Sequence, residues 1–190
     1  MNCCPVDIWA VNLDIVRRTL ALTPEEQARA ARFRFERDRV HWSQARSALR
    51  SILARYVPGA PEELVFVYGE HGKPALQNGA GIEFNISHSK GWAMVAVTRG
   101  VPVGIDLEAI RENVDIARLL HRIGETQLTG TKDELFHVWT RREARTKAVG
   151  GPLMEIPTAD LRVVDITAPP GFAASVALEG TDAEPRYQSG

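Results

Sequence analysis

Hydrophobic and polar positions change their spacing several times along the chain, and each change predicts a different element. Alternating positions predict a strand at residues 6–13. Helical spacing follows up to about residue 56, opening on Thr23-Pro24-Glu25-Glu26, which has the residue types of a capping box with proline in the first turn. We expect this helix to break near Phe35 and to end at Pro58-Gly59.

The rest of the chain predicts short strands and two more helices. Strand patterns lie at residues 64–68, 82–86, 92–98, 102–107, 161–166 and 172–178. Helical patterns lie at residues 113–121 and 132–149, and the second ends at Gly150-Gly151-Pro152. We expect the polar tail after Gly180 to be frayed. Because strands and helices do not alternate regularly, the order favours an α+β fold over a doubly wound sheet.

The composition is that of an ordinary globular protein. Its 190 residues are 44% hydrophobic and 25% charged. A chain of this length buries ~70% of its surface on folding, which gives a core without disulfides or structural metals. No apolar run is long enough to span a membrane, and the first residues lack the pattern of a secretion signal. Because the adjacent Cys3 and Cys4 cannot form a disulfide framework or a zinc site, we expect a cytoplasmic protein.

Charge is unevenly distributed, although the net charge is only −1. Between Arg29 and Arg55 the chain carries eight arginines and only two acids. Arginine matches the geometry of phosphates and carboxylates, so this segment predicts an anionic ligand or partner; the alternative is a solvated helix face. The chain as a whole is not basic and has no aromatic–basic motif, so we expect no nucleic-acid partner, and no membrane partner either.

Two carboxylates share one face of a predicted strand. In Val103-Gly104-Ile105-Asp106-Leu107-Glu108 the side chains alternate, so Ile105 and Leu107 point into a core while Asp106 and Glu108 point the other way. Two like charges held side by side need a cation or a proton between them, and oxygen ligands at this spacing suit Mg²⁺. The alternative is a strand end that exposes a polar face to water.

The helix predicted at residues 132–149 carries Trp139, Glu143 and Lys147 on one face, because these residues are four apart. Glu143 could act as a third metal ligand or as a base, and Lys147 could reach an anionic ligand. The alternative is an ordinary Glu–Lys surface pair. The two interpretations differ in whether this face is turned toward Asp106 and Glu108.

The stretch Phe84-Asn85-Ile86-Ser87-His88-Ser89 predicts a strand that passes into a turn. Backbone N–H groups, the Ser87 hydroxyl and the His88 imidazole could converge there on a phosphate. A Ser–His nucleophile pair is disfavoured because no nucleophile-elbow glycine pattern surrounds Ser87. The alternative is a polar turn without a ligand.

Taken together, these stretches resemble the 4′-phosphopantetheinyl transferase superfamily, in particular its surfactin-synthetase-activating type. The matching stretches are Gly72-Lys73-Pro74, the Phe84 to Ser89 stretch, Val103 to Glu108, and Trp139-Thr140-Arg141-Arg142-Glu143-Ala144-Arg145-Thr146-Lys147. They occur in the family's order across residues 30–180. The resemblance implies an α+β fold in a pseudo-twofold arrangement of two similar halves, residues 1–98 and 99–190, with the active site in the cleft between them.

The resemblance also implies the chemistry. Members transfer the 4′-phosphopantetheine group from coenzyme A to a serine of an acyl, polyketide or peptidyl carrier protein, releasing adenosine 3′,5′-bisphosphate, with Mg²⁺ or Mn²⁺ as the metal. By position, the metal ligands would be Asp106, Glu108 and Glu143. Glu143 and Lys147 would be catalytic, and either Glu143 or a water that it shares with the metal would take the serine proton. The coenzyme A contacts would be Arg50, Lys73, Pro74, Ser87, His88, Arg111 and Lys147.

Three departures from the family pattern bear on function. Arg142 replaces a lysine, Pro152 replaces the second glycine of the loop that follows Lys147, and the stretch between Glu108 and Trp139 is short. Because of Pro152 and the short stretch, a relative that binds coenzyme A without transferring its arm is one alternative. A metal-dependent phosphoesterase using the same acidic residues is another. We expect a monomer whose partners are coenzyme A and a carrier protein.

Overall fold

The computed structural model describes residues 3–15, 22–126, 128–151 and 160–188. The larger sheet has the strand order β4-β5-β1-β9, formed by β1 (Cys3–Asn12), β4 (Ile82–Ser89), β5 (Trp92–Arg99) and β9 (Asp182–Gln188). The smaller sheet has the order β6-β8-β7, formed by β6 (Val103–Ala109), β7 (Leu161–Asp165) and β8 (Phe172–Glu179). The short strands β2 (Phe66–Tyr68) and β3 (Pro74–Leu76) pair separately. Mixed helices and sheets of this kind confirm the predicted α+β class.

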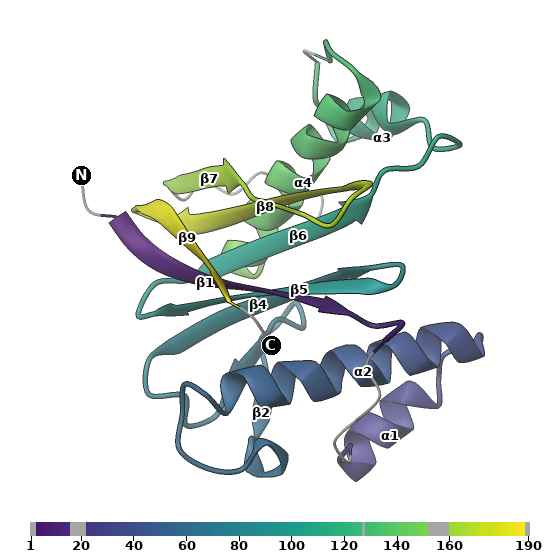
Figure 1. Ribbon diagram of the computed structural model, residues 1–190. Coiled ribbons are helices and arrows are strands. Elements are labelled where there is room, and N and C mark those ends of the chain that lie inside the picture. The colour runs from purple at the N-terminus through teal and green to yellow at the C-terminus, as the bar shows by residue number, and fades with distance from the viewer. Residues whose placement is uncertain (1–2, 16–21, 127, 152–159, 189–190) are drawn as a thin grey trace.

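The helices cover the outer faces of the two sheets (Figure 1). On the larger sheet lies α2 (Glu36–Leu53), with α1 (Pro24–Ala30) beside it, and α4 (Lys132–Val149) lies on the smaller sheet beside α3 (Ile116–Arg122). A single turn of 3-10 helix, Pro61–Glu63, follows α2. None of the helices within the described residues is long and apolar enough to cross a membrane.

Apolar side chains fill the space between the sheets and beneath α2. The first core joins β1 and β5 to β6 and β8, and includes Ile8, Ile105 and Leu107. A second core packs the apolar stripe of α2, around Leu49 and Leu53, against the larger sheet. The predicted inward direction of Ile105 and Leu107 is confirmed, since both are at most 1% exposed.

Local sequence signals set several helix ends, although α2 ends at Leu53, before the end expected at Pro58-Gly59. In α1 the Thr23 hydroxyl accepts from the Glu26 amide, and the Glu26 carboxylate accepts from the Thr23 amide. The predicted break near Phe35 is confirmed, because α1 ends at Ala30 and α2 begins at Glu36, after an extended Phe35. Helix α4 has the bounds expected for it, and it is capped by Gly150, whose φ of 67° is left-handed and suits glycine.

Two predictions about strands were wrong. Residues 87–89 do not leave the strand in a turn; they continue β4, which pairs with β5 as far as Ser89 opposite Trp92. The tail after Gly180 is not frayed, because its residues form β9, which pairs in parallel with β1 from Cys3 opposite Asp182 onward. Residues 87–89 are thus held by the hairpin with β5, whereas β9 is held by a strand distant in sequence, which overrides a weak local strand preference.

The order of elements is repeated along the chain. A strand, an 18-residue helix and an antiparallel hairpin occur first as β1, α2, β4 and β5, and again as β6, α4, β7 and β8. In both sets the second hairpin strand lies in the middle and pairs antiparallel with the first strand of the set. The last strand, β9, then adds to the far side of β1 in the larger sheet.

Side chains join β4, an edge of the larger sheet, to β6, an edge of the smaller sheet. The Asn85 side-chain oxygen accepts from the Ile105 amide at 2.9 Å, and the Ser89 hydroxyl accepts from the Ala109 amide at 3.1 Å. Backbone donors of an edge strand are thereby satisfied without a continuous ladder. This seam between β4 and β6 is where the predicted site residues meet.

Candidate active site

The two strand acids lie on the seam between β4 and β6. Asp106 is 3% exposed and Glu108 is half-buried, so the polar face of β6 is not a solvated strand end. The two side chains point away from the core that holds Ile105 and Leu107, as the alternation predicts.

Helix α4 lies directly against this face of β6. A Cβ atom at Gly104 would overlap the carbonyl oxygen of Ala144 and the amide nitrogen of Ala148, so a side chain there would keep the helix from its place. The close approach brings the α4 face that carries Glu143 and Lys147 onto the strand acids. Glu143 is only 6% exposed, which excludes the interpretation of these residues as an ordinary surface pair.

Asp106 is held by one residue from each half of the chain. Its Oδ1 accepts from the Lys147 ammonium at 2.6 Å and from the Ser87 hydroxyl at 2.9 Å, and the ammonium also donates to the Ser87 hydroxyl at 3.1 Å. The other oxygen of Asp106, Oδ2, is buried and has no hydrogen-bond partner among the described residues. A buried carboxylate oxygen without a partner is costly unless a cation or donor reaches it.

Glu108 lies at the more exposed end of the acid cluster, which we define as Asp106, Glu108 and Glu143. Its Oε2 accepts from the Ser89 hydroxyl at 3.1 Å and pairs with the Arg111 guanidinium at 3.4 Å. Burial, reinforced by the charge of Asp106, raises the pKa of Glu108.

Glu143 is the most strongly perturbed member of the acid cluster. Burial and the charges of Asp106 and Glu108 raise the pKa of Glu143 to about 7, although Lys147 and Arg142 oppose the shift. Carboxylate oxygens gathered in this way are the type of ligand that a hard divalent cation takes. The described residues contain no group of three acidic, histidine or cysteine side chains already arranged to hold a metal ion. The chemistry of the cluster and the orphaned Asp106 oxygen nevertheless fit Mg²⁺.

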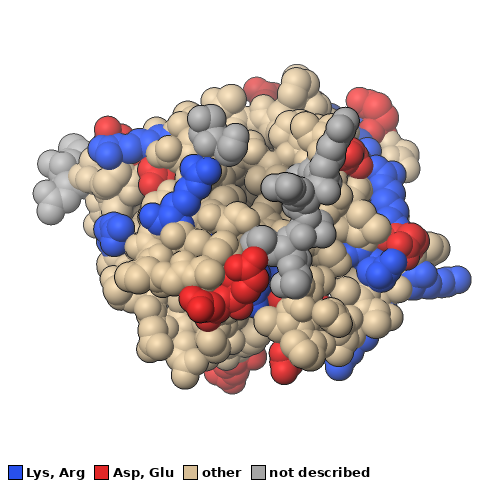
Figure 2. Space-filling view, turned by 60° about the horizontal axis from the view of Figure 1, so that its bottom comes forward, with Lys and Arg blue, Asp and Glu red and all other residues tan. Residues whose placement is uncertain are grey.

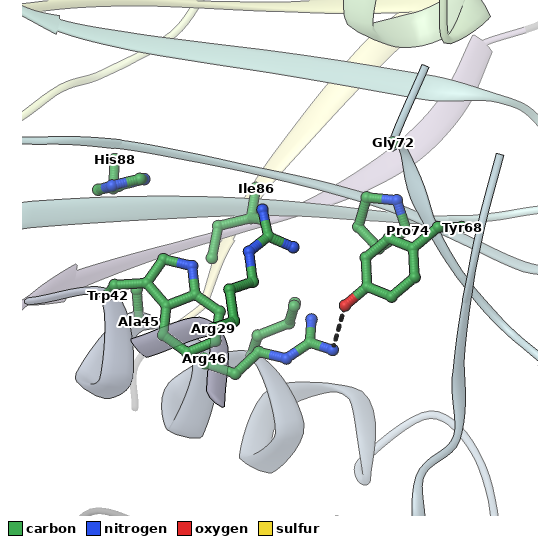
Figure 3. Close-up of a pocket in the computed structure, with 10 residues that line it drawn as sticks. Arg29, Trp42, Ala45, Arg46, Tyr68, Gly72, Pro74, Ile86 and His88 are labelled. Atoms are coloured by element: carbon green, nitrogen blue, oxygen red, sulfur yellow. Dashed lines mark hydrogen bonds between the residues drawn. The ribbon is translucent and has the colours of Figure 1, made fainter. Parts of the chain in front are cut away.

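An aromatic and basic cavity of about 190 Å³ lies between α1, α2 and the β2–β3 hairpin (Figure 3). Arg29 lies over the rings of Trp42 and Tyr68, and Arg46 donates to the Tyr68 hydroxyl at 3.0 Å. His88 and Pro74 line the same cavity. Flat rings beside guanidinium groups form a surface suited to a planar base that carries phosphates.

A second cavity, of about 420 Å³, is lined by His88 and by Glu108, the more exposed member of the acid cluster. Its lining combines cationic and imidazole groups with two acids: Phe33, Arg37, Asp38, His41, His88, Ser89, Lys90, Glu108 and Arg111. His88 lines both cavities, and desolvation together with the charges of Lys147 and His41 lowers its pKa. The two cavities therefore adjoin at His88, and the second one reaches Glu108 of the acid cluster.

Ser87 and His88 do not act together in a turn, because β4 continues through both and sends their side chains to opposite faces. Ser87 faces Asp106, whereas His88 faces the cavities beside α2. The expectation that both would converge on one phosphate is corrected by this alternation.

Two predicted ligand contacts already have partners inside the protein. Arg50 is 2% exposed; its guanidinium binds the Glu26 carboxylate and the carbonyl oxygens of Pro61 and Leu64. Lys73 donates to the carbonyl oxygens of Val103 and Ala148. Neither residue has an atom in the lining of the two cavities.

Sequence reasoning missed several residues of the site. Asn85 and Ser89 contact β6, and their period-two spacing with Ser87 would have revealed a polar strand face. Trp42 and Tyr68 lie on elements predicted correctly, but no local pattern marks them as cavity residues. Arg142, noted above as a departure, pairs with Glu125 at 3.2 Å, while Pro152 lies outside the described residues.

Exposed arginines gather where α1 joins α2, at the right-hand edge of the space-filling view in Figure 2. They are Arg32, Arg34, Arg37 and Arg39. Arg37 also lines the second cavity, so the basic surface continues to its mouth. The predicted excess of positive charge in this segment is thus split between internal ion pairs and an exposed rim.

Comparisons with known proteins identify relatives of this chain. Residues 9–99 match the family described as 4′-phosphopantetheinyl transferase, N-terminal. The 4′-phosphopantetheinyl transferase HetI of Nostoc is 34% identical over 168 residues, covering 80% of this chain and 71% of that protein. AcpT of Salmonella typhimurium is 33% identical, covering 58% and 61%. Sfp of Bacillus subtilis is 28% identical, covering 68% and 60%. The last two matches thus span less than two thirds of those proteins.

Proposed function

Because the chain belongs to the 4′-phosphopantetheinyl transferase family, we propose that it transfers the 4′-phosphopantetheine group of coenzyme A to a serine of a carrier protein. Adenosine 3′,5′-bisphosphate is the second product. The observation that carries this proposal is the acid cluster, in which the buried Asp106 and the half-buried Glu108 of β6 lie near the buried Glu143 of α4, beside a basic cavity.

The acid cluster would hold Mg²⁺ through Asp106, Glu108 and Glu143. When bound, the metal would neutralise charge on the pyrophosphate of coenzyme A. Lys147 then serves two purposes: it fixes Asp106 through its ammonium group, and it offers a positive charge to phosphate oxygens that enter from the second cavity. The Ser87 hydroxyl bonds to both the Lys147 ammonium and the Asp106 carboxylate and so helps to fix their relative position.

The proposed transfer step forms one bond, breaks one bond and moves one proton. The serine oxygen of the carrier protein forms a bond to the phosphorus that carries the pantetheine arm. The bridging oxygen of the pyrophosphate leaves with its electron pair on adenosine 3′,5′-bisphosphate. Glu143, or a water that it shares with the metal, is the candidate to accept the serine proton, because its carboxylate belongs to the acid cluster proposed to face the pyrophosphate. Catalysis then rests mainly on positioning and charge stabilisation.

Coenzyme A would occupy both cavities. We place the adenine in the first cavity, where Trp42, Tyr68 and Arg29 form its walls. The phosphates occupy the second cavity, near His88, Lys90 and Arg111, and end at the acid cluster. Arg50 supports this arrangement from inside by binding Glu26, which also pairs with Arg46 of the first cavity.

The repeated order of elements supports the pseudo-twofold arrangement. Residues 1–98 and 99–190 each contribute a strand, a long helix and a hairpin, and the acid cluster lies where the two sets meet. The exposed arginines where α1 joins α2 would give an acidic carrier protein a complementary surface near the mouth of the second cavity.

Intact-mass spectrometry of apo carrier proteins tests the proposed function. The protein is incubated with coenzyme A, Mg²⁺ and, separately, acyl, polyketide and peptidyl carrier proteins. The expected result is a gain of one phosphopantetheine unit on at least one carrier, absent when Mg²⁺ is removed by a chelator. Coenzyme A binding in calorimetry without any mass gain would contradict the proposal, as would release of inorganic phosphate from simple esters without a carrier protein.

A further inference from the structure

The Lys73 side chain connects the cavity to the helix that carries the catalytic groups. Its ammonium donates to the carbonyl oxygen of Ala148, near the C-terminus of α4, at 2.6 Å, and to that of Val103, at the start of β6, at 3.1 Å. These two acceptors belong to residues 99–190, whereas Lys73 lies in the turn that joins β2 to β3. One side chain thus bonds to both elements that build the acid cluster.

The turn around Lys73 is built to hold this position. Gly69 donates to the Lys73 carbonyl at 3.0 Å, Gly72 donates to the Gly69 carbonyl at 2.9 Å, and Gly72 has a left-handed φ of 79°. On the other side, a Cβ atom at Gly150 would lie 3.4 Å from Lys73 Cδ, so the absence of a side chain there leaves room for the lysine stem.

The Lys73 ammonium is well suited to the two carbonyl oxygens that it contacts within the protein. Carbonyl oxygens at the C-terminus of a helix lack partners in the helix and carry partial negative charge, which an ammonium group satisfies. Lys73 is partly buried, and removal from water lowers its pKa, with Glu83 and Glu179 opposing the shift. Leaving these two carbonyl groups, one near the end of α4 and one at the start of β6, without this donor would cost free energy.

The neighbours of Lys73 belong to the first cavity. Gly72 and Pro74 line it, and Tyr68 at the end of β2 forms one of its walls. In α4, Lys147 immediately precedes Ala148, and Glu143 lies five residues before it. A shift of this turn relative to α4 would change the distance between the bound adenine and the groups that act on the pyrophosphate.

We propose that Lys73 is a positioning residue that fastens the cavity turn to α4 and β6, rather than a contact for coenzyme A. This inference rests on the proposed function for its catalytic readout. It reassigns a lysine expected from the family resemblance to bind the ligand, and it gives the seam between the two halves a second attachment besides Asn85, Ser87 and Ser89.

The test compares Lys73→Met with Lys73→Arg. For Lys73→Met we expect kcat for carrier modification to fall about tenfold or more, because small misplacements of catalytic groups cost this much. The KM for coenzyme A and the Kd for adenosine 3′,5′-bisphosphate, measured by calorimetry, should stay within about threefold, since no ligand contact is lost. Lys73→Arg keeps the charge and donors and should restore part of kcat.

Lys132→Met is the matched control. Lys132 also anchors α4, but at its opposite end, where it pairs with Glu112. We expect it to leave kcat and KM unchanged. Hydrogen exchange of the last turn of α4 gives a readout that needs no activity: exchange there should become faster in Lys73→Met and remain unchanged in Lys132→Met.

Two results would overturn the inference. If the Kd for adenosine 3′,5′-bisphosphate rises about tenfold in Lys73→Met while exchange in α4 is unchanged, Lys73 contacts the ligand. If kcat and exchange are both unchanged, Lys73 positions nothing. A wild-type protein that modifies no carrier would refute the proposed function instead, and the exchange experiment would still decide the role of Lys73.

Discussion

Gly104 of β6 and Ala144 of α4 are in direct backbone contact. The glycine has no side chain, and a Cβ in its place would overlap the Ala144 carbonyl oxygen. This contact sets how closely α4 approaches the strand two residues before Asp106. The position of Glu143 and Lys147 relative to Asp106 therefore depends on the absence of a single methyl group.

Gly104→Ala should push α4 away from β6. We expect a loss of about 1–3 kcal/mol in the free energy of unfolding, the usual cost of overpacking, and a larger relative loss of transferase activity. Urea unfolding and carrier modification measure the two effects. Gly69→Ala is the control, because its nearest neighbour outside the adjoining residues would lie 3.8 Å from the new Cβ. Equal activity of Gly104→Ala and wild type would show that α4 does not need this close approach.

Removing the Lys147 ammonium should leave Asp106 buried with only Ser87 as a donor. Breaking a buried ion pair costs about 3–5 kcal/mol, and we expect the lower end of this range for Lys147→Met because the lysine is a quarter exposed. Lys147→Met combined with Asp106→Asn should recover part of that loss. Denaturant unfolding of wild type, the two single variants and the double variant gives a double-mutant cycle. If the losses in the free energy of unfolding of the single variants add up to that of the double variant, the two residues are not coupled.

Stability without metal should fall as the pH rises through neutrality. Because burial raises the pKa of Glu143 from 4.5 to about 7, the folded state binds this proton more tightly than the unfolded state. The proton on Glu143 therefore stabilises the folded state fully below pH 4.5, and this stabilisation is lost as the pH rises to 7. The free energy of unfolding should fall by about 3 kcal/mol over this range. Urea unfolding in the presence of a chelator, at several pH values between 5 and 8, measures this change in the free energy of unfolding.

Glu143→Gln is the control for this pH dependence. In this variant the free energy of unfolding should change much less with pH. The smaller change that remains should come from Glu108, whose pKa is raised in the same direction. An unchanged slope in Glu143→Gln would assign the titration to another group and contradict the description of the acid cluster.

Arg29 should contribute to ligand binding without supporting the fold. It is exposed and lines the first cavity over Trp42 and Tyr68. For Arg29→Met we expect the Kd of adenosine 3′,5′-bisphosphate to rise about tenfold, the equivalent of one charge-assisted contact, with unfolding unchanged. Arg32→Met removes an exposed charge from the same segment outside the cavity and should have a smaller effect. Equal effects of the two variants would indicate only a general loss of positive charge.

Much of the fold could be predicted because its signals are local. Capping boxes at Thr23 and Thr131 and the left-handed Gly150 set the ends of helices, so the bounds of α4 agree with those expected. The alternation in β6 places Asp106 and Glu108 on one face for the same reason, since neighbouring side chains in a strand point to opposite sides.

The remainder depends on contacts between distant segments. Strand β9 forms because β1, at the other end of the chain, offers its free edge, and no local pattern in the polar tail reveals this. Residues 87–89 continue β4 through the hairpin with β5, and Ser87 and Ser89 also bond to the distant strand β6. The partners of Arg50 and Lys73 likewise come from segments that the fold alone brings near. A sequence motif indicates that a charged residue matters but not which group it contacts.

The central claim is that the buried carboxylates at the seam drive phosphopantetheine transfer. The most direct measurement is the intact mass of an apo carrier protein after incubation with coenzyme A, Mg²⁺ and either wild type or Asp106→Asn, once calorimetry has shown that both bind coenzyme A. We predict that the carrier gains one phosphopantetheine unit with wild type and none with Asp106→Asn. A complete mass gain at the wild-type rate with the variant would contradict the account.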